Sequence, residues 1–195
     1  MIGFVAGFGR CGTSLACAML AAGGLQVAGL APVFEDHRFS PRRTDPAWRL
    51  AQTGRVVKWV CPLTTWCPDK AQGRVLWLDR NPEEQVKSKV KLALACGKRR
   101  TDPGKMAQEI AAQIRHHTAG ADALAGEQGP VERLAFEDLL ADPLYGARRL
   151  ASFFRPFGVL DVAAAAAVVR PRTPDCRPDL EVDVGKLRLG LFSHA

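Results

Sequence analysis

The sequence predicts an α/β fold, a three-layer sandwich in which helices cover both faces of a parallel sheet. Four short segments, two of which are apolar runs at 2–6 and 74–78, have the length of strands, and helical segments separate them along the chain. Continuous apolar runs are typical of strands that are buried on both faces, as they are in parallel sheets. Strands that alternate with helices build such layered folds. The predicted strands are residues 2–6, 55–60, 74–78 and 131–136.

The helices are predicted from capping residues and from apolar residues that recur every three or four positions. Asparagine and aspartate accept hydrogen bonds from the first amides of a helix, and proline suits its first position. Four of the helices begin at such an Asn-Pro or Asp-Pro pair. The predicted helices cover residues 13–22, 46–54, 82–96, 103–128, 143–154 and 161–169. The apolar stripe expected in the helix at 143–154 consists of Leu144, Ala147, Ala151 and Phe154.

The length of the chain suits a single domain, which we expect to span residues 1–195. The hydrophobic share of 47% and the charged share of 24% are typical of a globular protein with a buried core. No run approaches the roughly 18 apolar residues that a membrane-spanning helix requires. The six cysteines show no Cys-x-x-Cys pair and no metal-ligand spacing, so we expect reduced thiols, a cytoplasmic location and no metal.

The formal net charge of +7 favours anionic ligands, among them nucleic acids, acidic polymers and highly charged nucleotides. The densest basic runs are residues 42–43 and 98–100. Neither run has the interleaved aromatic residues of a surface that stacks single-stranded bases. The basic runs therefore do not favour nucleic acid, which stays behind the other anionic ligands as a third alternative.

A glycine-rich segment joins the first strand to the first helix and reads Gly7-Phe-Gly-Arg-Cys-Gly-Thr-Ser14. The helix N-terminus offers amide groups and a positive dipole end, and the glycines let the backbone approach a phosphate closely. Gly7 and Gly12 have the spacing of a nucleotide phosphate loop, but Thr13 stands where the lysine of that loop belongs. The positive charge is at Arg10. The segment therefore predicts an anion site that is poorly suited to the γ-phosphate of ATP.

A second candidate element follows the strand at 74–78. Arg80 comes directly after the strand, and Ser88 lies less than two turns into the next helix. A guanidinium fork and a neutral hydroxyl donor together suit one phosphate. Because ligands of parallel sheets bind at the carboxyl ends of the strands, we expect the glycine-rich loop, Lys58 and Arg80 to share one crevice.

Together, the loop and the Arg80–Ser88 pair resemble the two nucleotide-binding motifs of sulfotransferases that use 3′-phosphoadenosine 5′-phosphosulfate (PAPS). The first motif of this family commonly reads Gly-x-Pro-(Arg/Lys)-Ser-Gly-Thr-(Ser/Thr), and here Gly9 replaces the proline and Cys11 the serine. The second is an arginine, often followed by Asn-Pro or Asp-Pro, with a serine eight positions later. The resemblance covers residues 1–158 and implies a sandwich like that of the P-loop nucleoside triphosphate hydrolases.

The resemblance implies sulfuryl transfer from PAPS to a hydroxyl or amine acceptor, with 3′,5′-ADP as the product and no metal. Arg10 would stabilise the leaving 5′-phosphate. Lys58, which resembles the lysine of the family's Lys-x-x-x-Pro element, would reach the bridging or sulfonate oxygen. A small molecule, a carbohydrate or a protein each fits as the acceptor. The donor-binding residues that the resemblance implies are Gly9, Arg10, Cys11, Gly12, Thr13, Ser14, Arg80 and Ser88.

The general base is expected in the polar loop after the first helix, where Glu35, Asp36 and His37 are consecutive. Sulfotransferases use histidine or glutamate, and small bacterial relatives often place an acidic residue in this loop. Glu35 is therefore the first choice, with His37 as the alternative. The pair His116–His117 lies within a predicted helix and is interpreted as structural or surface-exposed.

Two other functions fit parts of the sequence. The run Val75–Asp79 is an apolar strand that ends in aspartate, as a Walker B element does, and Thr13 is available for magnesium; this pattern is typical of a P-loop kinase acting on a small molecule. The absence of a lysine after Gly12 argues against a kinase. The second alternative is a catalytically idle relative that binds a nucleotide, which the substitutions at Gly9 and Cys11 favour.

Overall fold

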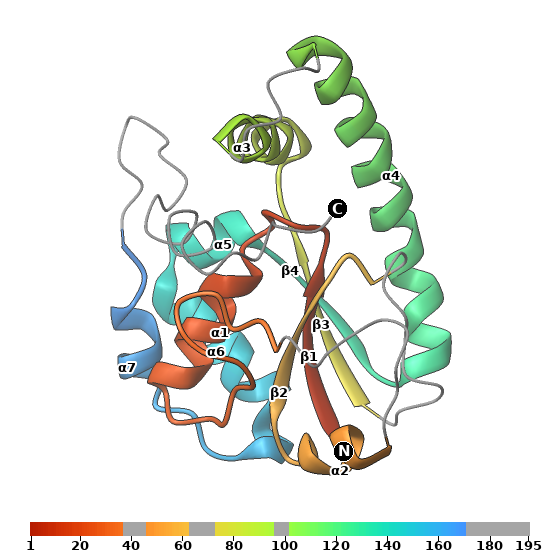
Figure 1. Ribbon diagram of the computed structural model, residues 1–195. Helices are drawn as coiled ribbons and strands as arrows, with labels where there is room; N and C mark the ends of the chain where they lie inside the picture. Colours follow the sequence, from red (N-terminus) through yellow and green to blue (C-terminus); the bar gives the residue numbers. More distant parts are fainter. Residues whose placement is uncertain (37–45, 63–72, 96–101, 171–195) are drawn as a thin grey trace.

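Figure 1 shows the computed structural model of the chain, an α/β sandwich built on four parallel strands. The structure describes residues 1–36, 46–62, 73–95 and 102–170. Each strand overlaps a predicted one, and helices lie on both faces of the sheet, so the predicted three-layer fold is confirmed. In sheet order, the strands are β2 (Val56–Val60), β1 (Ile2–Gly7), β3 (Gly73–Asp79) and β4 (Val131–Ala135).

The position of β1 in the sheet determines where the ligand site lies. All six of its residues are buried, because it has a neighbouring strand on each side and helices over each face. The chain leaves β1 to form β2 on one side and then returns to form β3 on the other. Connections that leave two adjacent strands in opposite directions open a crevice at their carboxyl ends. The glycine-rich loop follows β1, and Arg80 follows β3, so both border this crevice.

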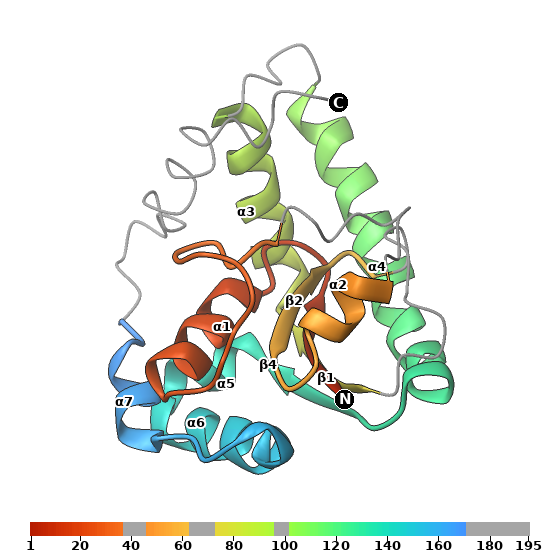
Figure 2. The same ribbon diagram turned by 60° about the horizontal axis from the view of Figure 1, so that its bottom comes forward.

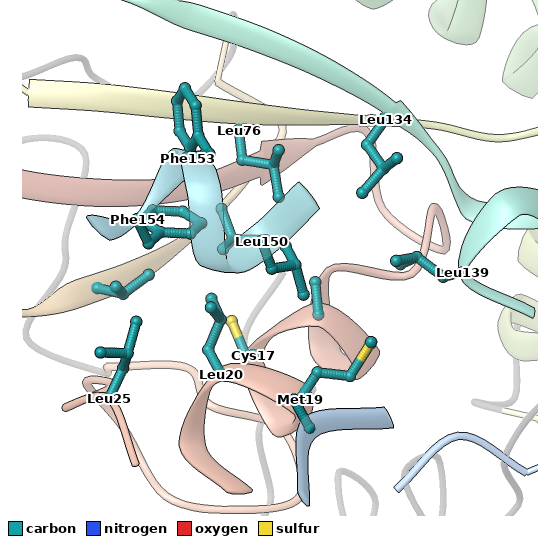
Figure 3. Packing of buried hydrophobic residues seen from close by; sticks show 14 of the residues in the cluster. Cys17, Met19, Leu20, Leu25, Leu76, Leu134, Leu139, Leu150, Phe153 and Phe154 are labelled. Carbon is teal, nitrogen blue, oxygen red and sulfur yellow. The ribbon is translucent and has the colours of Figure 1, made fainter. Parts of the chain in front are cut away.

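One face of the sheet carries the larger part of the core. Leu76 of β3 packs there among apolar residues of the covering helices, including Leu20 and Leu150 (Figure 3). Burial of each such side chain contributes about 1.5–3 kcal/mol to folding. The helices of this layer are α1 (Thr13–Ala22), α5 (Phe136–Ala141), α6 (Pro143–Phe153) and α7 (Val162–Ala167), with the short 3-10 turn η1 (Arg155–Phe157) after α6.

The opposite face is covered by α2 (Pro46–Ala51) and α4 (Pro103–Gln128) (Figure 2). Trp59 and Trp77 lie under this layer with almost no exposed surface. The remaining helix, α3 (Pro82–Ala95), extends beyond the carboxyl edge of the sheet and packs against α4. No helix in these described residues combines the length and the apolar character that a membrane span needs.

The predicted helix caps are confirmed at three positions. Asn81 accepts hydrogen bonds from the amides of Glu83 and Glu84, and Asp102 accepts one from Lys105. The third is Asp142, which accepts from Tyr145. Asp161, predicted as the first residue of a helix, is instead the cap of α7 and accepts from Ala164. Since α3 begins at the Asn81 cap, the chain turns away from the sheet directly after Arg80, which leaves the Arg80 side chain at the crevice.

The structure corrects two predictions near β4. The strand ends at Ala135, and Phe136 begins α5, a helix that the sequence did not predict. In α6 the buried face is centred on Leu150, and Leu144 is 47% exposed. At about 100° per residue, Leu144 lies roughly 120° around the helix from that centre, so it does not belong to the buried face. The other three predicted residues, Ala147, Ala151 and Phe154, do pack against the core.

Candidate functional site

The glycine-rich loop crosses the carboxyl edge of the sheet between β1 and α1. Gly12 has a φ of 96°, in the left-handed region, and a Cβ atom there would lie 2.2 Å from the ring of Phe136. Only glycine fits both conditions. Gly12 is also the N-cap of α1, and no side chain in the described ranges caps this helix. The first amides of α1 therefore suit an anionic ligand, as the sequence predicted.

A buried glutamine of α3 braces the loop. The Nε2 atom of Gln85 donates to the carbonyl oxygens of Phe8 and Gly9, at 2.7 and 3.1 Å, and the side chain is 3% exposed. These bonds fix the backbone just before Arg10. Gln85 is not among the residues that the sequence motifs predict. The signal that could have found it is its spacing of three residues from Ser88, which places two polar side chains on one face of a helix.

The structure brings Arg10, Arg80 and Ser88 together. The Nε atom of Arg10 donates to the Ser88 hydroxyl at 2.9 Å, and Nη1 of Arg80 donates to the Arg10 carbonyl at 2.8 Å. The Arg80 guanidinium lies over the ring of Phe136, with its Cζ 4.8 Å from the ring centroid. Arg10 itself has a φ of 73°, which costs a non-glycine residue about 1–2 kcal/mol. Strained backbone of this kind is concentrated at functional sites.

Lys58 lies on the other side of the loop and is buried with three acceptors. Its side chain is 2% exposed, and Nζ donates to Ser14 Oγ at 3.0 Å, to the Val33 carbonyl at 2.8 Å and to Glu35 Oε1 at 3.0 Å. A buried ammonium is stable only when it is paired and hydrogen-bonded, and three acceptors match its three donors. Lys58 therefore ties the start of α1 to the loop that carries the predicted base.

The three consecutive residues predicted to include the general base differ in their surroundings. Glu35 contacts Lys58, yet its side chain keeps 35% of its surface exposed, so its carboxylate can still meet a substrate. Asp36 is buried, and its carboxylate accepts from the indole of Trp48 at 3.0 Å and from Gln52 at 3.5 Å. Asp36 thus anchors the loop to α2. His37 lies outside the described residues.

Cys11, which takes the place of the usual serine, is buried in the loop with 1% of its surface exposed. Burial raises the pKa of its thiol to about 12, so the sulfur is neutral at pH 7. A Cβ placed on Gly7 would lie 2.5 Å from the Cys11 sulfur, which shows how tightly the thiol packs under the loop. Binding of the donor by Cys11 stays a prediction. Because the thiol is buried, we expect the backbone of Cys11 to make this contact.

The aspartate at the end of β3 is held by neighbouring side chains. Asp79 accepts two hydrogen bonds from Arg133, at 2.8 and 2.9 Å, and a third from the indole of Trp77 at 3.1 Å. These bonds occupy both carboxylate oxygens and tie β3 to β4. The similarity of Asp79 to a Walker B aspartate thus has a structural explanation, and no contact of Asp79 in the described residues favours the kinase alternative.

Phe8 packs between two basic residues at the outer side of the loop. His117 of α4 stacks on its ring with a centroid distance of 4.6 Å, and Lys89 Nζ lies 3.8 Å from the ring centroid. His117 is 2% exposed, and burial, together with His116 and Lys89, lowers its pKa to about 4. The interpretation of His117 as structural agrees with this burial, while His116 is exposed. Lys89 is not among the predicted site residues.

Comparison with known proteins supports the fold. No protein-family model and no curated protein matches the chain. Among solved structures, a sulfotransferase from Alicyclobacillus acidocaldarius superposes with a TM-score of 0.55 and 16% identity, over 99% of this chain and 96% of that one. The sulfotransferase domain from the curacin biosynthetic pathway superposes with a TM-score of 0.50 and 13% identity, over 96% and 97%.

A third structure similar to the chain is that of retinol dehydratase in complex with androsterone and the inactive cofactor PAP. It superposes with a TM-score of 0.55 and 16% identity, over 85% of this chain. The match covers 62% of the retinol dehydratase chain, so this chain spans less than two thirds of that protein. The topology of the sheet and these neighbours together show that the chain has the sulfotransferase fold, a form of the P-loop nucleoside triphosphate hydrolase fold.

Proposed function

We propose that the protein is a sulfotransferase that moves a sulfuryl group from PAPS to a hydroxyl or amine acceptor and releases 3′,5′-ADP. The observation that carries this proposal is the hydrogen-bonded group of Arg10, Arg80 and Ser88 beside the uncapped start of α1. Two guanidinium groups, a buried hydroxyl and a helix N-terminus suit a ligand that carries two separate anionic groups. PAP, the ligand named for retinol dehydratase, is 3′,5′-ADP.

The chemistry of these groups fits the PAPS donor. The 3′-phosphate carries close to two negative charges and suits Arg80 with Ser88, since guanidinium groups bind phosphate through paired N–H donors. The 5′-phosphosulfate suits the backbone amides at the start of α1. Residues that would hold this second group are Gly9, Arg10, Cys11, Gly12, Thr13 and Ser14. When bound, PAPS supplies an activated sulfuryl group, and the protein is left to position it and to neutralise charge.

Lys58 and Glu35 serve the reacting end in this proposal. Glu35 accepts the proton of the acceptor as its oxygen or nitrogen forms a bond to sulfur and the bond from sulfur to the 5′-phosphate oxygen breaks. Lys58, which contacts both Glu35 and Ser14, stabilises the negative charge that develops between acceptor and leaving group. Its contacts place one cation between the predicted base and the start of α1.

The acceptor and the location of the protein are part of the proposal. A half-exposed carboxylate at Glu35 suits an acceptor that approaches from solvent, whether a small molecule, a carbohydrate or a protein. The buried, neutral thiol of Cys11 agrees with a reducing cytoplasm, where cysteines need no partner.

Calorimetric titration with 3′,5′-ADP tests the donor site. We expect Kd in the micromolar range for the wild type and at least a tenfold increase for Arg80→Ala, a loss of about 1.4 kcal/mol or more. Lys87→Ala is a matched control, because Lys87 is on the same helix as Ser88 but its side chain is 64% exposed and pairs with Glu84 at the surface. This control should bind as the wild type does.

Two results would count against the proposal. One is an unchanged affinity for 3′,5′-ADP in Arg80→Ala. The other is binding of ATP that requires magnesium, with no preference for 3′,5′-ADP, which would favour the kinase alternative. Product formation is tested separately by supplying PAPS with panels of hydroxyl and amine acceptors and measuring released 3′,5′-ADP. Binding of 3′,5′-ADP without turnover on any acceptor would favour the catalytically idle alternative.

A further inference from the structure

The backbone of Arg10 directs this residue toward α3. Its left-handed conformation, with a φ of 73°, turns its carbonyl oxygen to the Arg80 guanidinium, which donates to it at 2.8 Å. Gln85 holds the two preceding carbonyls, those of Phe8 and Gly9, from the same helix. Three consecutive carbonyl groups of the loop are thus bonded to the strand end and the helix that carry the second nucleotide motif.

The side chain of Arg10 points the same way. Its Nε atom donates to the hydroxyl of Ser88 at 2.9 Å, and Ser88 is 5% exposed. This single bond joins residues 78 positions apart in the chain, from the two separate motifs. A guanidinium carries its five N–H donors in one planar fork, so the bond through Nε also places the two terminal nitrogens of Arg10 near the Ser88 hydroxyl.

We propose that the Arg10 side chain is the third group of the 3′-phosphate site and makes the protein selective for 3′-phosphorylated nucleotides. This inference rests on the proposed function and changes the role expected for Arg10, whose side chain would otherwise serve the leaving 5′-phosphate. Two guanidinium groups beside Ser88 match the charge of close to two on a phosphate monoester. The amides of α1 and Lys58 then remain for the 5′-phosphosulfate.

The test compares two nucleotides that differ only at the 3′ position, 3′,5′-ADP and 5′-AMP. The variant is Arg10→Gly, because glycine adopts a φ of 73° without strain and keeps the loop in its fold. Kd is measured by calorimetry for both nucleotides in the wild type, in this variant and in the Lys87→Ala control. We expect the variant to lose at least tenfold in affinity for 3′,5′-ADP and less than threefold for 5′-AMP. The control should change neither value.

The other possible results would overturn either the inference about Arg10 or the proposed function. Parallel losses for both nucleotides would overturn the inference and return the Arg10 side chain to the 5′ end, with the proposed function intact. Unchanged affinity for both nucleotides would also overturn it. Failure of the wild type to bind 3′,5′-ADP would refute the proposed function itself, and the inference with it. As a second measurement, Arg10→Gly and Ser88→Ala together should cost less affinity for 3′,5′-ADP than the sum of the two single losses, since the residues share one phosphate.

Discussion

The substitution Gly12→Ala tests whether the loop is held in one shape by the ring of Phe136. An alanine at this position meets two separate penalties. Its backbone must keep a φ of 96°, and its Cβ would lie 2.2 Å from one ring carbon of Phe136 and 2.9 Å from another. Because the Arg80 guanidinium lies over the same ring, movement of Phe136 also displaces Arg80. The variant should therefore lose both stability and affinity for 3′,5′-ADP.

The loss of stability in Gly12→Ala can be divided into its two parts with a matched control at the other end of α1. Gly24, just past the end of α1, has a φ of 95°, and nothing lies within 4 Å of a Cβ placed there. Gly24→Ala thus carries the left-handed backbone cost of about 1–2 kcal/mol without the clash. Overpacking a buried site costs about 1–3 kcal/mol more. Both variants lower the entropy of the unfolded chain equally, so the difference between them isolates the contact with Phe136.

Urea unfolding of both variants measures the two free energies of unfolding. We expect Gly12→Ala to lose about 1–3 kcal/mol more than Gly24→Ala. A second variant, Gly12→Ala with Phe136→Leu, removes the ring and should recover part of that difference, while the affinity for 3′,5′-ADP stays low because Arg80 has lost its support. Equal destabilisation by Gly12→Ala and Gly24→Ala would refute the reasoning.

Three further predictions concern the surroundings of the loop. Glu35→Gln should lower turnover at least about 100-fold with an unchanged Kd for 3′,5′-ADP, measured by product release and calorimetry; full activity would reject Glu35 as the base. Asp36→Ala leaves the buried indole N–H of Trp48 without this acceptor and should cost about 1–3 kcal/mol in urea unfolding, and Trp48→Phe in the same chain should lessen the loss. His117 has its pKa lowered from 6.5 to about 4, so the unfolded chain binds a proton that the folded chain excludes, and stability should fall as the pH drops from 6.5 toward 4. His117→Leu should have a shallower fall in urea midpoint over this window, and an identical fall would contradict the assignment.

Local signals in the sequence predict the elements and the position of the loop. Asn81 and Asp102 each precede a proline, and both cap helices in the structure, because capping depends on residues within one turn. Strand order is different, since it depends on which apolar faces meet, yet the rule that ligands bind at the carboxyl edge needs no strand order. The glycine-rich loop, Lys58 and Arg80 could therefore be placed in one crevice from the sequence.

The contacts within the site could not be predicted in the same way. Gln85 bonds to the loop 76 and 77 positions away, and Asp36 to Trp48 at a separation of 12 positions. Such pairs depend on the angle at which one helix crosses another or on the path of a loop. The spacing of residues along the sequence predicts neither. The burial of Lys58 is a further example, because a lysine on a strand can equally reach solvent.

The hydrogen bonds that Arg10, Arg80 and Lys58 make with Ser88, the Arg10 carbonyl and Glu35 differ in the charge of the acceptor. The bond from Arg10 to the Ser88 hydroxyl and the bond from Arg80 to the Arg10 carbonyl have neutral acceptors, and exchange of a neutral acceptor for a phosphate oxygen strengthens such a bond about twofold. Lys58 donates to the carboxylate of Glu35, so a phosphate gains less by replacing that partner. This difference favours the arginines as the groups that bind the donor. It favours the Lys58–Glu35 pair as the group at the reacting end, where a proton must leave the acceptor while charge builds on the leaving oxygen.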